Sequence, residues 1–313
     1  MSNKKLLVLF GATGNQGGST AHFVLDDPTL AKQYAVRAIT RDINNSKAQE
    51  LQKKGAELVA ADLDEPSTLP AALRGAHSVF LLTNTQYGGN SREIETRQAK
   101  AALGEALKQG VEYVIWSSMS HPYKISGGNL AQVEHFDDKA EIEEYIRGLP
   151  IKSAFYAPGS FMQNSSTHMK PRPSPANDGT HILGNLCSSA TRIPLIDITD
   201  SGKWIGAILA EPDKYEGKFF AAAERLYSFE EIAQVMSKVS GKTVIHQQFP
   251  DEVFKSFVPE SPLKEALCEM WLFIRDYGYY GTNMERDVEW ASQQAKGRLT
   301  SLEEYLTKSG WTL

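Results

Sequence analysis

The chain has 313 residues and a formal net charge of −5; 41% of its residues are hydrophobic and 23% are charged. This composition is typical of a globular protein large enough for two lobes, and it lacks the basic excess of a nucleic-acid-binding protein. The longest apolar run near the start, Leu6–Phe10, is too short for a secretory segment or a membrane span. We therefore expect no nucleic acid and no membrane among the partners.

Cys187 and Cys268 are too few for a disulfide framework and lack metal-ligand spacing. We predict two core residues of a protein in a reducing compartment, expected to be the cytoplasm, and no metal site.

Short apolar runs alternate with helix-like segments in the first half of the chain. Near-continuous apolar runs are typical of strands in a parallel sheet that is covered on both faces. The pattern predicts an α/β fold, a Rossmann-type doubly wound parallel sheet. The six expected strands are Leu6–Phe10, Val36–Thr40, Leu58–Ala61, Val79–Leu82, Tyr113–Trp116 and Ile151–Tyr156.

The alternation of strands and helices ends after Pro158. A proline- and glycine-rich surface loop is expected further on, at 170–179. Capping boxes are predicted at Ser228/Glu231 and at Thr300/Glu303, each marking the start of a helix. We predict a Rossmann domain over residues 1–158 and a smaller mixed α+β lobe over 159–313, from which some segments return to the first sheet.

A glycine-rich turn follows the first expected strand and precedes a helix. Gly11 permits the tight turn, Gly14 lets the backbone approach a pyrophosphate, and Gly17 lets the helix pack on the strand. The alternative is a glycine turn without a ligand. The context favours a dinucleotide site, to which Thr13, Asn15 and Gln16 of the same turn also belong.

The residues after the second strand bear on the choice of dinucleotide. Arg41 suits the 2′-phosphate of NADP, and Lys47 is a candidate for a second cation, whereas Asp42 is unfavourable beside a phosphate unless it points away. Arg41 as a solvated surface charge is the alternative. We expect NADP, with NADPH as the preferred form and NAD as the second choice.

Polar residues also follow the third and fourth strands. Asp62, next to Leu63, is placed to accept a hydrogen bond from the adenine amino group, or else to cap the next helix. Thr83 and Asn84 lie where cofactor phosphates and the nicotinamide ribose pass. The segment Asn84–Asn90 has few apolar anchors, so we expect it to become more ordered when cofactor binds.

These motifs together resemble the NmrA-like family, atypical members of the short-chain dehydrogenase/reductase superfamily. The matching segments are GATGNQG, TRD, AADLD, FLLTN and HFDDKAEIEEYI in the first half and DITDSGKWIGAIL and SFEEIAQVMSKVSGKTV in the second. The resemblance is closest to the redox-sensor branch. It implies NAD(P) binding and redox-dependent protein partners, transcription factors among them, which would add the nucleus as a compartment.

The superfamily's usual catalytic pair is Tyr-x-x-x-Lys on one helix face, and here His135 and Lys139 stand at that spacing. The resemblance implies that Lys139 positions the nicotinamide ribose, whereas a neutral His135 is a poor proton donor. On spacing alone, Asp138 and Glu141 form a helix-start box and Lys139 is a surface charge. We interpret the pair as a degenerate active site that has lost its catalytic function.

Other groups could supply a proton, and they leave a second function open. Tyr156, expected beside the cofactor, is one of them, with Ser117, Ser118 and Tyr123. The leading hypothesis is a dinucleotide-binding regulator that acts through a transcription factor or a metabolic enzyme, as a monomer or a dimer. The alternative, which leaves enzyme status uncertain, is an NADPH-dependent reductase of a small carbonyl or unsaturated compound. Aromatic residues of the second lobe would then line its pocket, unless they are core.

Overall fold

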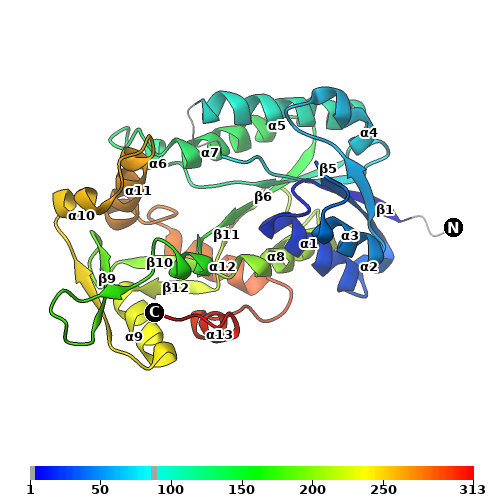
Figure 1. The fold of residues 1–313 in the computed structure, drawn as a ribbon. Helices are drawn as coiled ribbons and strands as arrows, with labels where there is room; N and C mark the ends of the chain where they lie inside the picture. The colour runs from blue at the N-terminus through cyan, green and yellow to red at the C-terminus, as the bar shows by residue number, and fades with distance from the viewer. Residues whose placement is uncertain (1–3, 86–89) are drawn as a thin grey trace.

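The computed structural model describes residues 4–85 and 90–313. A seven-stranded sheet forms the centre of the described chain, with all strands parallel in the order β11-β6-β5-β4-β1-β2-β3 (Figure 1). This confirms the Rossmann-type sheet. Its strands are β1 (Lys5–Leu9), β2 (Tyr34–Thr40), β3 (Glu57–Ala60), β4 (Ser78–Leu81), β5 (Tyr113–Ser117), β6 (Lys152–Pro158) and β11 (Phe219–Ala222).

Helices cover both faces of the sheet because its side chains are apolar on both sides. The helices on one face are α1 (Asn15–Asp26), α2 (Leu30–Gln33), α3 (Ser46–Lys53) and α8 (Ser201–Ala210). Those on the other are α4 (Leu69–Leu73), α5 (Ser91–Lys108) and α7 (Glu134–Arg147). The short α6 (Pro122–Ile125) follows β5.

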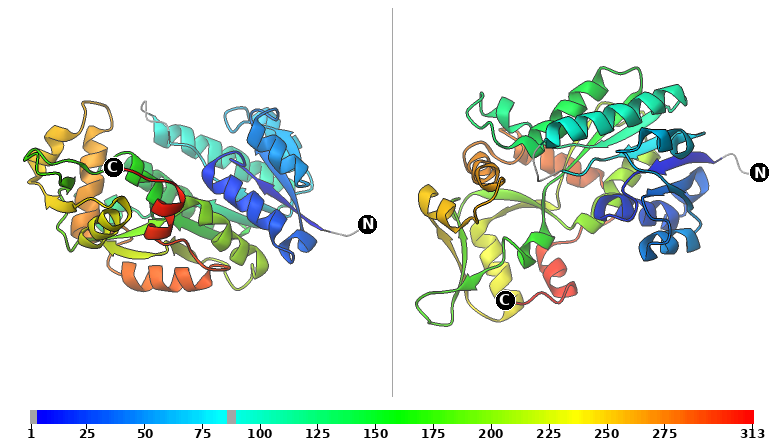
Figure 2. Two further views of the ribbon diagram at one scale, coloured as in Figure 1. Left: turned by 60° about the horizontal axis from the view of Figure 1, so that its bottom comes forward. Right: turned by 45° about the horizontal axis from the view of Figure 1, so that its top comes forward.

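The second lobe contains two small sheets and lies at the end of the molecule opposite the N-terminus (Figure 2). One sheet has the order β12-β10-β7 and the other β13-β9-β8. Their strands are β7 (Ser160–Phe161), β8 (Arg172–Pro173), β9 (His181–Asn185), β10 (Arg192–Ile196), β12 (Arg225–Ser228) and β13 (Val244–Gln248). The helices are α9 (Phe229–Ser240), α10 (Asp251–Phe257), α11 (Lys264–Tyr277), α12 (Met284–Gln294) and α13 (Leu302–Lys308).

The second half of the chain returns to the first sheet at several places. β11 extends the sheet beside β6, and α8 packs on α1 so closely that a Cβ at Gly206 would lie 2.4 Å from the ring of Phe23. Ala291 of α12 joins the same core. The chain therefore passes between the two structural units several times.

Three local expectations are corrected by the structure. The C-terminal capping box is formed by Ser301 and Glu304, one residue later than predicted, whereas the box at Ser228 is confirmed. The loop at 170–179 includes the two-residue strand β8, paired antiparallel with β9. Finally, α7 begins at Glu134, so that Asp138 and Glu141 lie inside the helix and do not form its start.

Most aromatic residues at 271–280 in the second lobe are core residues, whereas Tyr277 is half-buried and Phe257 is 56% exposed. Trp271, Phe273, Tyr279 and Tyr280 are buried, and the Tyr280 hydroxyl donates to the carbonyl of Ala157 at 2.8 Å. Both cysteines are buried and free. Among the described residues, no helix is both long and apolar enough to cross a lipid bilayer.

Candidate functional site

The glycine loop has the geometry that its spacing predicts. Gly11 adopts φ +63°, a left-handed conformation that other residues rarely adopt. A Cβ at Gly17 would lie 2.4 Å from the Gly11 carbonyl oxygen, so only glycine fits between loop and helix. Because α1 begins at Asn15, its first N–H groups have no partners within the helix, and Asn15, Gln16 and Gly17 line the cavity beside the loop.

A cavity of about 500 Å³ lies at the carboxyl ends of β1, β2 and β3. Most of the predicted cofactor residues line it: Gly11, Thr13, Gly14, Asn15, Gln16, Gly17, Arg41, Asp62, Leu63 and Asn84. Sequence reasoning missed other lining residues, among them Phe10, Asn45, Leu82, Gln98 and Phe161. Phe161 comes from the second half of the chain, and no local motif marks it.

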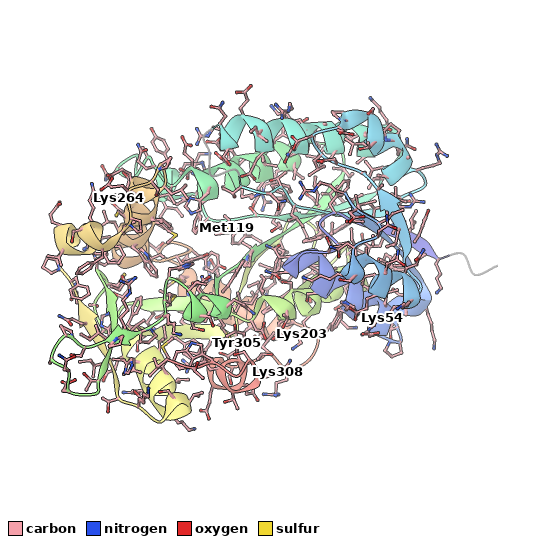
Figure 3. All side chains as sticks on the ribbon, viewed as in Figure 1. Lys54, Met119, Lys203, Lys264, Tyr305 and Lys308 are labelled. Atoms are coloured by element: carbon pink, nitrogen blue, oxygen red, sulfur yellow. The ribbon has the colours of Figure 1, made fainter. Side chains whose placement is uncertain are left out.

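Arg41 lines the cavity, is exposed, and has no ion pair to any described residue. Asp42 uses its Oδ1 to accept a hydrogen bond from the Asn44 N–H at 2.8 Å, which turns that carboxylate oxygen into its own loop. Lys47 does not line this cavity. It lines a second cavity of about 600 Å³, together with Lys203 (labelled in Figure 3). The two cavities share Thr13, Gly14 and Asn15 of the glycine loop.

The far end of the cavity contains an acceptor without a partner. Gln98 donates from its amide nitrogen to Asp64 at 3.0 Å, while its Oε1 is buried and accepts no hydrogen bond from the described residues. Asp62 accepts from the Asp64 N–H at 3.0 Å through Oδ1, so it stabilises its own turn. The glycine loop suits the phosphates of a ligand, and the unpartnered Gln98 oxygen suits an amino group of the same ligand.

Lys139 is buried, and all three of its N–H donors are used inside the protein. They are donated to the Thr83 carbonyl oxygen at 2.5 Å, to the Thr83 hydroxyl at 2.6 Å and to a carboxylate oxygen of Glu95. An ammonium has only three donors. The surface-charge alternative for Lys139 is therefore wrong. Burial lowers the pKa of Lys139, and the Glu95 carboxylate opposes that shift.

His135 lies on the first turn of α7, with its ring 4.8 Å from that of Phe136. Burial lowers its pKa to about 4, and Lys139 acts in the same direction, while Asp137 and Glu95 oppose it. The imidazole is therefore neutral at pH 7. A neutral imidazole can accept or donate one hydrogen bond, but it is a weak acid.

We expect NMR titration to find the His135 midpoint near pH 4, well below the ordinary 6.5. Because the folded-state pKa is below the unfolded one, the stability that His135 contributes is present above pH 6.5 and is lost as the pH falls towards 4. Imidazole resonances assigned with the His135→Gln variant provide the measurement. A midpoint above pH 6 would contradict this account of the site.

None of the other proton-donor candidates lines the cavity, although Ser117 is bound to Gln16, which does. Ser117 donates to Gln16 at 2.7 Å, and Ser118 donates to the buried Glu143 at 2.5 Å. Tyr123 is 49% exposed on the surface. Tyr156 is fully buried and donates to Ser201 on α8 at 2.8 Å, so it does not line the cavity.

Three consecutive residues connect α7 to its surroundings. Asp137 pairs with His121 in the segment after β5 (2.6 Å), and Asp138 pairs with Arg92 of α5 (2.8 Å). Lys139 then binds Thr83, which follows β4, and Glu95 of α5, as described above.

The expected ordering of residues 84–90 concerns mainly residues 86–89, which lie outside the described residues.

Comparisons with known proteins agree with this fold. The sequence pattern of the NmrA-like family matches residues 3–306. An NmrA-like family domain-containing protein of Dictyostelium discoideum is 32% identical, with 99% of each chain covered. An NmrA-like family domain-containing oxidoreductase of Penicillium ochrochloron is 27% identical over 76% of this chain and 74% of its own.

Among solved structures, NmrA, a negative transcriptional regulator crystallised with NAD, has a TM-score of 0.80 at 22% identity, covering 97% of this chain and 95% of its own. With the family pattern spanning nearly the whole sequence and a full-length relative above 30% identity, the chain belongs to the NmrA-like family.

Proposed function

We propose that the protein binds NADP(H) in the cavity at the carboxyl ends of β1, β2 and β3. The glycine cradle of Gly11, Gly14 and Gly17 would hold the pyrophosphate, and Arg41 the 2′-phosphate. Asp62 or Gln98 would accept from the adenine amino group. Support comes from NmrA, crystallised both with NAD and with NADP. When bound, the nicotinamide could supply or accept a hydride.

We further propose that the protein acts as a redox-sensing regulator rather than as a rapid enzyme. The observation that carries this proposal is the complete engagement of Lys139 by Thr83 and Glu95. In the superfamily's catalytic pair, the lysine keeps a donor for the ribose and acidifies a tyrosine. Here every donor is used, and a neutral His135 stands in the place of the tyrosine.

The regulatory proposal implies a protein partner, a transcription factor or a metabolic enzyme, whose binding depends on cofactor occupancy. It places the protein in the cytoplasm and, where the partner is a transcription factor, also in the nucleus. Support comes from the solved relative that is a negative transcriptional regulator.

A second candidate function is NADPH-dependent reduction of a small carbonyl or unsaturated compound. The observation that favours it is the set of curated relatives described as oxidoreductases, the Penicillium protein among them. In this case Lys139 would have to release one of its present acceptors to reach the cofactor. Bound water, rather than His135, would then have to deliver the proton.

Steady-state kinetics separates the two functions. We expect NADPH consumption with a panel of carbonyl, enone and quinone compounds to stay far below the median enzyme rate of roughly 10 per second. The site lacks an acidified proton donor among its described residues, which is the reason for a low rate. His135→Ala should bind NADPH as the wild type does. Ordinary turnover that disappears in His135→Ala would establish a reductase and refute the regulator.

A further inference from the structure

Glu95 is a buried carboxylate that no sequence motif marks. It lies on α5 with its side chain fully inaccessible to solvent, facing Lys139 across the interface with α7. Its Oε2 accepts from the Lys139 ammonium and from the Thr83 hydroxyl, while its Oε1 accepts from the Ser91 hydroxyl at 3.0 Å. Glu95 is therefore held in one position by three donors.

Two other buried carboxylates of α7 are matched by arginines, and Asp137 pairs with His121. Asp138 pairs with Arg92, and Glu143 pairs with Arg147 on the same helix. His135 is neutral. Lys139 does not itself line the cofactor cavity, but its ammonium is bound to Thr83, whose neighbour Asn84 does. The charge behind this part of the cavity is thus decided by Glu95: with the carboxylate in place the pair is neutral, and without it the Lys139 ammonium has no counter-ion.

This difference matters for a nicotinamide ring because its oxidised form carries a positive charge and its reduced form does not. A lone ammonium near the ring would repel the oxidised form, and the repulsion would be strong where solvent is excluded. The neutral pair exerts a much weaker field, because the two opposite charges lie in direct contact.

We infer that Glu95 is a specificity-determining residue for the redox state of the bound dinucleotide. By cancelling the charge of Lys139, it removes the penalty that a lone lysine would impose on the oxidised cofactor. The inference rests on the proposed dinucleotide site and gives the proposed sensor a means of holding both redox forms.

The test is the ratio of the dissociation constants for NADP⁺ and NADPH, measured by titration calorimetry on the full chain. Glu95→Gln keeps an oxygen that can accept from Lys139 and Thr83 while it removes the negative charge. We expect this variant to raise the ratio about tenfold, through weaker NADP⁺ binding. Glu93→Gln, an exposed position on the same helix, is the matched control and should leave the ratio unchanged.

A double variant, Glu95→Gln with Lys139→Met, removes both charges and should return the ratio to within about twofold of the wild type. A purely structural role for Glu95 would weaken both redox forms equally and leave the ratio unchanged in Glu95→Gln, which would overturn the inference. So would a double variant that keeps the shifted ratio. If Glu95→Gln does not fold, the double variant alone tests the inference. A ratio of dissociation constants far from the wild-type value in the double variant would then refute charge cancellation.

The ratio depends on binding alone, so the outcome is separable from that of the proposed function. Fast turnover by the wild type would refute the regulator and leave the charge effect intact. Failure of the folded wild type to bind either redox form would overturn the dinucleotide site and this inference together.

Discussion

Arg41→Ala is expected to weaken NADP(H) binding by about 1.5–3 kcal/mol, and NAD(H) binding far less. Arg41 lines the cavity and has no ion pair to any described residue, so its removal leaves no described side chain without its ionic partner. The lost interaction is then the charge-assisted contact with the 2′-phosphate, which NAD lacks. Titration calorimetry with both dinucleotides measures the two changes side by side.

Lys47→Ala is the matched control for this prediction. Lys47 lines the second cavity and not the proposed cofactor cavity, so its loss should change NADP(H) affinity much less than the loss of Arg41. Equal losses for NADP(H) and NAD(H) in Arg41→Ala would remove Arg41 from the 2′-phosphate contact and return it to the role of a surface charge.

Lys139→Met is expected to lower the free energy of unfolding by about 3–5 kcal/mol, the usual cost of leaving one member of a buried ion pair without its partner. The Glu95 carboxylate has no access to solvent, so it cannot recover the lost interaction by hydration. The Thr83 carbonyl oxygen loses a donor as well. Urea denaturation at pH 7 gives the free energy directly.

Lys108→Met serves as the control in the same experiment. Lys108 pairs with Glu105 at 3.6 Å, but its side chain is 76% exposed, so its loss should cost less than about 1 kcal/mol. Adding Glu95→Gln to Lys139→Met should recover much of the lost stability, because both charges are then absent. A Lys139→Met variant no less stable than the Lys108→Met variant would mean that the pair is not buried in solution.

The part of the site that depends on local geometry could be predicted from the sequence. The turn at Gly11 and the close packing at Gly17 require glycine, and this requirement is visible as a spacing. Six of the seven strands of the main sheet can be predicted because parallel sheets with both faces covered leave long apolar runs. β11 was missed because its four residues, Phe219–Ala222, form too short a run in a segment assigned to the other lobe.

Contacts between distant segments were beyond sequence reasoning. Glu95 stands in an ordinary amphipathic helix, and only the packing of α5 on α7 brings it to Lys139. Gln98 and Phe161 reach the cavity in the same way. Tyr156 shows the converse: it follows the alternation of β6 to the face covered by α8, so its hydroxyl meets Ser201 and does not reach the cavity.

The repeated passage of the chain between its two units has a mechanical consequence. Two domains joined by a single linker can undergo a hinge motion, because the one flexible segment absorbs the change in backbone angles. Here β11 is a strand of the first unit's sheet, and α8 and α12 contribute to the core on one face of that sheet. The Ser19 hydroxyl also donates to the Thr199 carbonyl oxygen at 2.5 Å while accepting from the Gly202 N–H at 2.9 Å. A large hinge motion would require several connecting segments of the chain to bend at the same time. Any signal from the dinucleotide must therefore travel as small shifts of side chains and loops on a stiff frame.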